Sequence, residues 1–146
     1  MDMGKAKKKH VGDGNMGHNK KAKQNGHKAE EIAKEFLPKF FDTVKVEFIN
    51  SLIDFYVNGH YIEVKSCLEW QIDSSHGEKG RRRGRFVIYK DQHDFLLKNN
   101  GFYLFVMRRL CGKTFIKLVR AKDVPVNFNN RNKCLVVWTK VMGEVV

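Results

Sequence analysis

Residues 53–66 have the sequence IDFYVNGHYIEVKS, in which two acids and a lysine stand among apolar residues. The pair Asn58-Gly59 is typical of a tight turn between antiparallel strands, because both residue types tolerate a positive φ. Side chains alternate between the two faces of a strand, so Glu63 and Lys65 share one face. Pairing through the turn brings Asp54 next to Glu63. We therefore expect a hairpin whose two carboxylates lie close enough to bind one ion.

This hairpin has the chemistry of a phosphodiester-hydrolysing site. Two acids beside a lysine are costly inside a fold unless a divalent cation and a bound anion complete the charge balance. Mg²⁺ prefers oxygen ligands and keeps several waters, so Asp54, Glu63 and a phosphate oxygen are sufficient, with Mn²⁺ as an alternative ion. The metal activates a water and neutralises phosphoryl charge. We expect Lys65 to position that water and to stabilise the transition state, since acting as a base would require a lowered pKa.

The sequence around the hairpin predicts one α/β domain. Apolar residues recur at helical spacing after Gly26, and Pro38 is expected to end that helix. Strands are expected at 44–48, 52–57, 61–64, 86–89, 102–107, 114–119 and 134–139, with a polar loop at 66–85 and a helix at 90–99. The Asn50-Ser51 pair is read as a turn, and Asn100-Gly101 as the left-handed end of the second helix. This order of helix, three strands, helix and strand, with additional C-terminal strands, predicts helices flanking a central mixed sheet.

The charge distribution favours a polyanionic partner. Lys and Arg total 28 against 16 acids, a net charge of +12, and nucleic acid is the leading candidate. The first 28 residues hold eight lysines and two aspartates, half of that surplus. We expect residues 1–25 to be a flexible basic arm, either a nucleic-acid contact or a tolerated tail, and residues 26–146 to be a single domain.

Several classes of protein are disfavoured. The sequence has no apolar run long enough to span a membrane and no leader peptide at its lysine-rich start, so we expect a cytoplasmic protein with no membrane association. Cys67, Cys111 and Cys134 are an odd set without close pairing, which favours reduced thiols. The dispersed histidines and cysteines lack the spacing of a zinc site, so no zinc is expected.

Three motifs resemble a known family. Gly26 and Glu30 form a G-x-x-x-E element, Asp54 and the Asn58-Gly59 turn precede Glu63-Val64-Lys65-Ser66, and Tyr89-Lys90-Asp91-Gln92 opens the second helix. Together they resemble the PD-(D/E)XK nucleases and, among these, the archaeal-type Holliday junction resolvases. Ile53 stands where the motif often has proline, a departure that leaves the chemistry intact. The resemblance covers about Gly26 to Met107.

The resemblance implies a restriction-endonuclease-like core and a set of functional residues. The implied catalytic residues are Glu30, Asp54, Glu63, Lys65 and Gln92. The implied metal ligands are Asp54, Glu63, Glu30 and the backbone carbonyl of Val64. Expected DNA contacts are Lys28, Ser66, Arg81, Arg82, Arg83, Arg85 and Lys90, the arginines being a dense cluster suited to backbone phosphates. A homodimer is expected, because symmetric cutting of two strands needs two sites related by a two-fold axis.

Three functions remain open at this point. The first is a structure-selective DNA endonuclease of resolvase type. The second keeps the catalytic centre but acts on ordinary duplex DNA, as restriction or repair nucleases do, and residues 67–85 are where the two would differ. The third is a non-catalytic nucleic-acid-binding module that retains the sheet and its basic surface. Two narrower alternatives also stay open: Glu63 and Lys65 as a solvated strand face, and Trp70 and Trp138 either as stacking partners of a base or protein or as ordinary packed residues.

Overall fold

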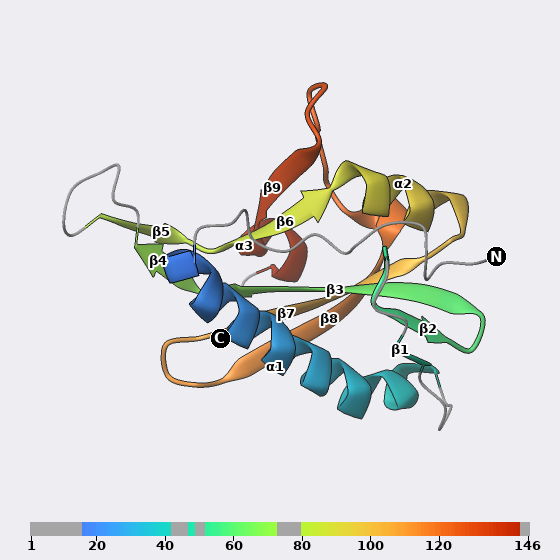
Figure 1. The fold of residues 1–146 in the computed structure, drawn as a ribbon, viewed down its shortest axis with the longest axis horizontal. Coiled ribbons are helices and arrows are strands. Elements are labelled where there is room, and N and C mark those ends of the chain that lie inside the picture. The colour runs from blue at the N-terminus through green and yellow to red at the C-terminus, as the bar shows by residue number, and fades with distance from the viewer. Residues whose placement is uncertain (1–15, 42–46, 49–51, 73–79, 144–146) are drawn as a thin grey trace.

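The computed structural model of the chain describes residues 16–41, 47–48, 52–72 and 80–143 (Figure 1). Its elements, in chain order, are α1 (Met16–Phe41), β1 (Glu47–Phe48), β2 (Phe55–Val57), β3 (His60–Leu68), β4 (Trp70–Ile72), β5 (Arg81–Arg83), β6 (Arg85–Tyr89), α2 (Lys90–Lys98), β7 (Phe102–Arg108), β8 (Thr114–Arg120), a 3-10 turn (Ala121–Asp123), β9 (Lys133–Val137) and α3 (Trp138–Met142). The predicted α/β class is confirmed.

A five-stranded mixed sheet forms the centre of the molecule, in the order β1-β2-β3-β7-β8. Strands β3 and β7 are parallel, from Ile62 opposite Phe102 to Leu68 opposite Arg108, and the other neighbours are antiparallel. The predicted apolar run of β7 is buried over its central five residues, as expected of a strand covered on both faces. Two smaller antiparallel pairs, β4–β5 and β6–β9, complete the described strands.

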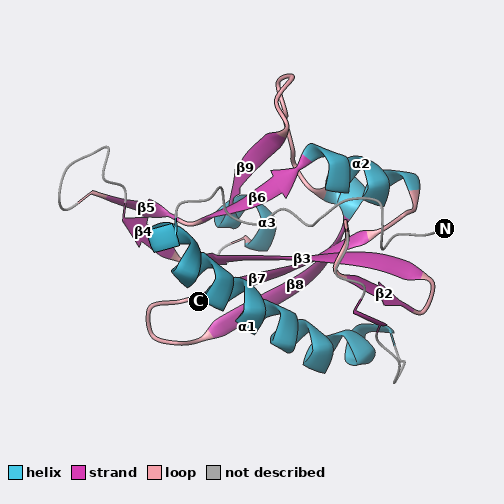
Figure 2. Cartoon of the chain, viewed as in Figure 1, coloured by secondary structure: helices cyan, strands magenta, loops and turns pink. Residues whose placement is uncertain are grey.

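The central sheet separates two apolar clusters. On one face, Ala29, Ala33 and Leu37 of α1 pack against Ile62 and Val64 of β3. On the other face, a second cluster combines residues of α2, β6, β7 and β9, among them Leu96, Phe86, Tyr103, Phe105 and Val136. Figures 1 and 2 show α1 and α2 on opposite sides of β3 accordingly. Because Ile62 and Val64 face α1, the alternating Glu63 and Lys65 face the α2 side.

Two turn predictions are confirmed by backbone conformation. Asn58 and Gly59 have φ of 48° and 85°, as a tight hairpin turn between β2 and β3 requires. Asn100 has φ of 54° after α2, and the amide of Gly101 donates to the Leu96 carbonyl at 2.7 Å. The second helix therefore ends in a left-handed residue, as expected.

The bounds of α1 differ from those predicted. The helix begins at Met16 rather than Gly26 and continues through Pro38 to Phe41, so residues 16–25 of the expected flexible arm are helical. Lysine, alanine and glutamine in that segment are good helix formers, and one interior glycine costs only about 1 kcal/mol. Pro38 has no amide to donate to the carbonyl four residues before it, and the helix continues for only three residues beyond it. Residues 1–15 lie outside the described residues, and the domain boundary at residue 26 stays a prediction.

The predicted loop at 66–85 is partly wrong. Strand β3 continues to Leu68, and β4 pairs with β5, placing Trp70 opposite Arg83 and Ile72 opposite Arg81. The aromatic and β-branched residues Trp70 and Ile72 favour an extended backbone, which outweighs the polar composition of the stretch. Residues 73–79 lie outside the described residues.

Three other strand bounds also change. The strand predicted at 52–57 begins only at Phe55, because Leu52 to Asp54 is bent. The strand predicted at 134–139 ends at Val137, where α3 begins. Only 47–48 of the strand predicted at 44–48 is described; Val44, Val46 and the predicted Asn50-Ser51 turn lie outside the described residues.

Candidate active site

The site lies where β2 and β3 separate. Backbone pairing between these strands ends at Phe55 and Ile62. Beyond it, the amide of Asp54 donates to Glu63 Oε1 at 3.0 Å, and the amide of Val64 donates to Asp54 Oδ2 at 2.9 Å. The Glu63 carboxylate thus accepts from the amide of Asp54 itself, and the Asp54 carboxylate accepts from the amide of the residue that follows Glu63. These two hydrogen bonds hold the two acids at adjacent positions, as the hairpin register predicts.

The acids are buried beside a lysine. Asp54 is 1% exposed and Glu63 is fully buried. Lys65 Nζ lies 3.3 Å from Glu63 Oε2, and the lysine side chain is 11% exposed. These three side chains together carry two negative charges and one positive charge, and adjacent buried carboxylates are stabilised when a further cation lies between them.

Gln92 connects this cluster to α2. Lys65 Nζ donates to Gln92 Oε1 at 2.8 Å, and Gln92 Nε2 donates to the Leu52 carbonyl at 2.9 Å. Gln92 is fully buried, and its own amide donates to Asp91 Oδ1 at 2.8 Å. The side-chain amide is therefore held at both ends. It fixes the ammonium of Lys65 relative to the bent segment that carries Asp54.

Tyr89 is a neighbour of the site that sequence reasoning did not single out. Its ring centroid lies 5.0 Å from Lys65 Nζ, close enough for a cation–π contact. Tyr89 is the last residue of β6, directly before α2. Its place at the start of the Tyr89-Lys90-Asp91-Gln92 motif was the signal that could have identified it.

A second buried polar pair lies behind the acids. His93 Nδ1 and the Tyr103 hydroxyl are 2.9 Å apart. Burial raises the pKa of Tyr103, and the negative charge of Glu63, followed by Asp94 and Asp91, raises it further. Burial lowers the pKa of His93, and Asp94 opposes that shift. Both side chains are thereby kept neutral beside the charged cluster.

The donor set suits a hard divalent cation such as Mg²⁺. Asp54 and Glu63 contribute carboxylate oxygens, and the Val64 carbonyl points to the Asp54 side of β3, because N–H and C=O of one strand residue point the same way. Within the described ranges, no three His, Cys, Asp or Glu side chains are grouped to hold a metal ion. Two acids and a carbonyl leave coordination positions for water or a phosphate oxygen.

The remaining predicted residues are distributed around the sheet. Glu30 is half-buried on α1, in the layer opposite Glu63, and its part in metal binding stays a prediction. Ser66 lies on the α1 face by strand alternation, so it does not share the face of Lys65. Lys28 is exposed and lines a groove with Glu31 and Arg108. Neither Asp54 nor Glu63 lines this groove.

The predicted DNA contacts on the other face are only partly grouped. Lys90 is exposed and pairs with Asp94 at 2.7 Å. Arg81 and Arg83 are exposed on β5, whereas Arg82 is half-buried. Arg85 is half-buried on β6, which pairs with β9, so the arginine cluster is divided between two sheets.

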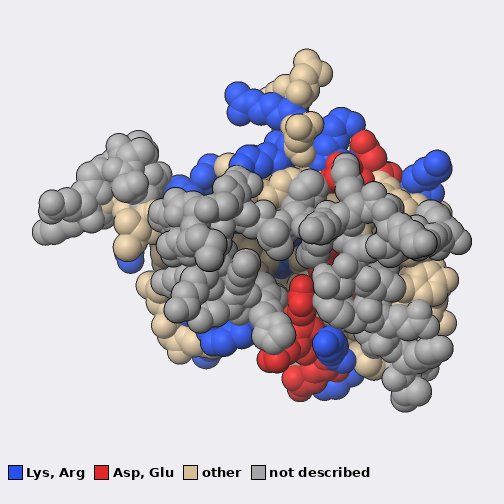
Figure 3. Space-filling view, in the orientation of Figure 1, with Lys and Arg blue, Asp and Glu red and all other residues tan. Residues whose placement is uncertain are grey.

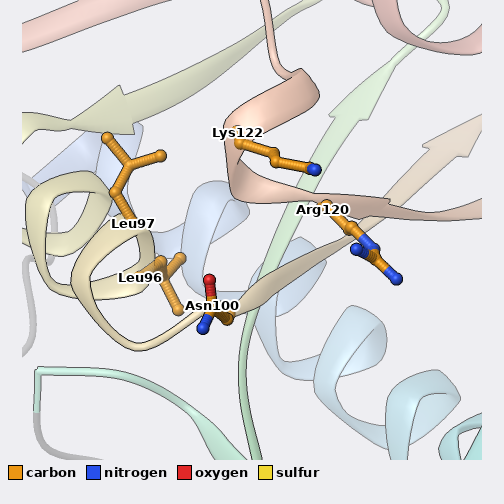
Figure 4. Close-up of a pocket in the computed structure, with 6 residues that line it drawn as sticks. Leu96, Leu97, Asn100, Arg120 and Lys122 are labelled. Carbon is orange, nitrogen blue, oxygen red and sulfur yellow. The ribbon is translucent and has the colours of Figure 1, made fainter.

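A small pocket at the end of α2 is separate from the acidic site. It is lined by Leu96, Leu97, Asn100, Gly101, Arg120 and Lys122 (Figure 4). Figure 4 shows Arg120 at the end of β8, Lys122 on the 3-10 turn that follows it, and the two leucines on α2. None of these residues belongs to the cluster of Asp54, Glu63, Lys65 and Gln92.

The geometry and a family comparison lead to the same class of protein. A family model described as the PD-(D/E)XK nuclease superfamily domain matches residues 16–140. The chain therefore belongs to the PD-(D/E)XK nuclease superfamily, and its mixed α/β fold is the restriction-endonuclease-like fold. No curated protein and no solved structure matches the chain. Across the described residues, no helix has the length and apolar character needed to cross a membrane.

Proposed function

We propose that this nuclease is a metal-dependent endonuclease that hydrolyses DNA phosphodiester bonds. The observation that carries the proposal is the buried cluster in which the carboxylates of Asp54 and Glu63 each accept a backbone amide across the two strands, while Lys65 is held by Glu63 and Gln92. Adjacent buried carboxylates beside an ammonium are suited to a divalent cation and a phosphate. The non-catalytic alternative leaves the burial of this cluster unexplained.

The contacts support a distinct role for each residue in this proposal. Asp54, Glu63 and the Val64 carbonyl would hold Mg²⁺ or Mn²⁺, which supplies an activated water and neutralises charge on the phosphoryl oxygens. The ammonium of Lys65 donates to a non-bridging oxygen of the scissile phosphate and orients the attacking water. Gln92 keeps the ammonium in that position, and the Tyr89 ring limits its other rotamers. Exclusion of water by the surrounding core strengthens each of these interactions.

Branched DNA is the substrate that we favour, as in the resolvase-type nucleases that the motifs resemble. The chain carries a net charge of +12, and Arg81 and Arg83 are exposed on the β4–β5 hairpin. Figure 3 shows further Lys and Arg side chains along the rim of the molecule between that hairpin and α2. A homodimer is part of this proposal, since two cuts in a symmetric junction need two centres.

Cleavage assays with matched variants test the proposal. The protein is incubated with Mg²⁺ or Mn²⁺ and with labelled four-way junction, duplex or single-stranded DNA. Glu63→Gln and Lys65→Met should bind these DNAs and lose cleavage by about 100-fold or more. Asp123→Asn and Lys113→Met, which change exposed residues outside the cluster, should cleave like the parent.

The outcomes separate the three functions. Preferential cutting of the junction supports the resolvase-type function, and equal cutting of the duplex replaces it with a duplex nuclease. DNA binding without cleavage by the parent protein with either metal would overturn the proposed hydrolysis. Analytical ultracentrifugation with and without junction DNA tests the dimer.

A further inference from the structure

One face of the β4–β5 hairpin combines cations, an indole and an exposed aliphatic side chain. The register pairs Trp70 with Arg83 and Ile72 with Arg81, so these four side chains share a face, while Gln71 and Arg82 share the other. We call the set of Trp70, Ile72, Arg81 and Arg83 the hairpin face. It lies at one end of the molecule, where β4 and β5 extend beyond the central sheet (Figure 1).

The arginines of the hairpin face are ordered by aromatic contacts. The guanidinium carbon of Arg81 lies 4.8 Å from the centre of the Trp70 ring. That of Arg83 lies 5.6 Å from Trp70 and 5.8 Å from Trp138. Such contacts restrict the rotamers of both guanidinium groups before any ligand binds. Two residues apart on a strand, the groups originate about 6.6 Å from each other, a spacing comparable to that of successive phosphates along one nucleic-acid strand.

The base of the hairpin is fixed to the core. Trp138 Nε1 and the Gly84 amide both donate to the Glu69 carbonyl, at 2.9 Å and 3.0 Å. The Glu69 carboxylate pairs with Arg109 at 3.2 Å. The base of the hairpin is therefore anchored to the core through Glu69, the residue that connects β3 to β4.

The exposure of Ile72 is unusual, because a large apolar side chain in water contributes nothing to the solubility of the protein. This residue is 81% exposed, the largest exposure among the large apolar side chains described, and it stands opposite Arg81. Apolar side chains flanked by cations on DNA-binding surfaces insert at base steps, and the unstacking costs a few kcal/mol in an intact duplex. That cost is smallest where a base is already unstacked, as at a branch point.

We propose that the hairpin face recognises branched DNA by placing Ile72 against an unstacked base at the branch while Arg81 and Arg83 bind two successive phosphates beside it. The inference rests on the proposed function, since it takes DNA as the substrate. Lys65 and Ile72 are seven residues apart on two nearly continuous strands, β3 and β4, which limits the separation of their backbones to about 23 Å. At about 3.4 Å per base pair, the cut falls within roughly seven base pairs of the branch.

Binding and base-unstacking measurements test the hairpin face without requiring cleavage. The full chain carrying Glu63→Gln is titrated onto a four-way junction and a matched duplex, each with 2-aminopurine at the branch or the equivalent position. The Glu63→Gln protein without further substitutions should raise 2-aminopurine fluorescence on the junction. Adding Ile72→Ala should abolish that rise and lower the ratio of junction affinity to duplex affinity about 10-fold. Adding Leu135→Ala, which truncates a 43% exposed leucine on β9, should change neither.

The outcomes distinguish this inference from the proposed function. An unchanged fluorescence rise and affinity ratio with Ile72→Ala would overturn the hairpin-face proposal, even if the wild-type chain cuts DNA. An Ile72-dependent rise with no cleavage by the wild-type chain would uphold it and overturn hydrolysis. Concentration-dependent self-association that Ile72→Ala removes, with DNA binding unaffected, would assign the face to a second copy of the chain and overturn the proposal.

Discussion

The carboxylates at the site accept hydrogen bonds from backbone amides, and they are also the groups suited to bind a metal ion. Asp54 and Glu63 each accept an amide hydrogen bond where the β2–β3 ladder stops. Their orientation is therefore set by the fold before any metal binds. Carboxylates held in this way lose little conformational freedom when a ligand binds.

Gln92 provides a test of positioning at the residue scale. Gln92→Ala removes the acceptor of Lys65 Nζ and the donor to the Leu52 carbonyl. We expect kcat to fall about 10- to 100-fold with a smaller change in KM, because the ammonium is misplaced but substrate contacts elsewhere remain. Steady-state cleavage kinetics measure this split, with the exposed Asn127→Ala as the matched control. A change confined to KM would contradict the positioning role.

His93 predicts a pH dependence of stability. Burial lowers its pKa below the ordinary 6.5. As pH falls, the unfolded chain therefore protonates His93 before the folded chain does. The stability that comes from keeping His93 neutral is fully present above pH 6.5 and is lost as pH falls through the lower pKa of the folded state. Urea unfolding of the metal-free protein at about pH 7.5 and pH 5.5 measures the loss.

A variant separates this effect from other titrating groups. His93→Gln retains a hydrogen-bonding partner for the Tyr103 hydroxyl but takes up no proton. Its free energy of unfolding should differ less between the two pH values than that of the parent. An equal difference in both proteins would show that other groups cause the pH dependence.

At the scale of elements, the hairpin around Asn58-Gly59 was predictable because its signals are local. A turn dipeptide with positive φ, alternation of side chains and the register they impose all lie within residues 53–66. The late start of β2, at Phe55 rather than Leu52, was not predictable in the same way. At Leu52 to Asp54 the backbone groups bond to side chains instead of a neighbouring strand: the Asp54 amide donates to Glu63, and the Leu52 carbonyl accepts from Gln92, which is 40 residues away in sequence.

Gly84 tests the connection between the hairpin and the core. A Cβ at this position would overlap the carbonyl oxygen of Leu68, which is backbone and cannot move aside cheaply. Gly84→Ala should therefore lower the free energy of unfolding by about 1–3 kcal/mol or more. Gly112→Ala is an informative comparison, because an added Cβ there meets nothing within 4 Å and only the φ of 91° opposes it. Thermal unfolding followed by circular dichroism compares the two variants, and a larger loss in Gly112→Ala would contradict the steric argument.

At the scale of the whole molecule, the sequence predicted a central mixed sheet but not that the other strands form two separate pairs, β4–β5 and β6–β9. The run of β7 predicted a strand buried on both faces, and it lies between β3 and β8 as such a strand must. Arg81 to Arg85 was read as one cluster, but Gly84 separates β5 from β6, and the two strands pair with different partners. Strand pairing between residues such as Val87 and Leu135 is set by the packed core, which no local pattern records.

The three cysteines are predicted to differ in reactivity because the fold exposes them differently. Cys67 is buried, Cys134 is partly buried and Cys111 is exposed, and all three are free thiols. Burial raises the pKa of Cys67 to about 12, so its thiolate is scarce at neutral pH. A thiol reagent added to the native protein at about pH 8 should modify Cys111 first and Cys67 only after urea unfolding. Cys111→Ser should remove the fast phase; fast modification of Cys67 in the native chain would contradict its burial.

The hydrogen bond between Glu69 and Gly84 at the base of the β4–β5 hairpin separates this hairpin from the acidic cluster. Those two residues join the hairpin to the core through a backbone hydrogen bond, so the chain between them can change length or composition while Asp54, Glu63 and Lys65 stay in place. In the proposed function, DNA binding by the hairpin face and phosphodiester hydrolysis at the acidic cluster would therefore belong to segments that can be altered independently. Replacing the residues between Glu69 and Gly84 would then change the preference for DNA shape without disturbing Asp54, Glu63 and Lys65.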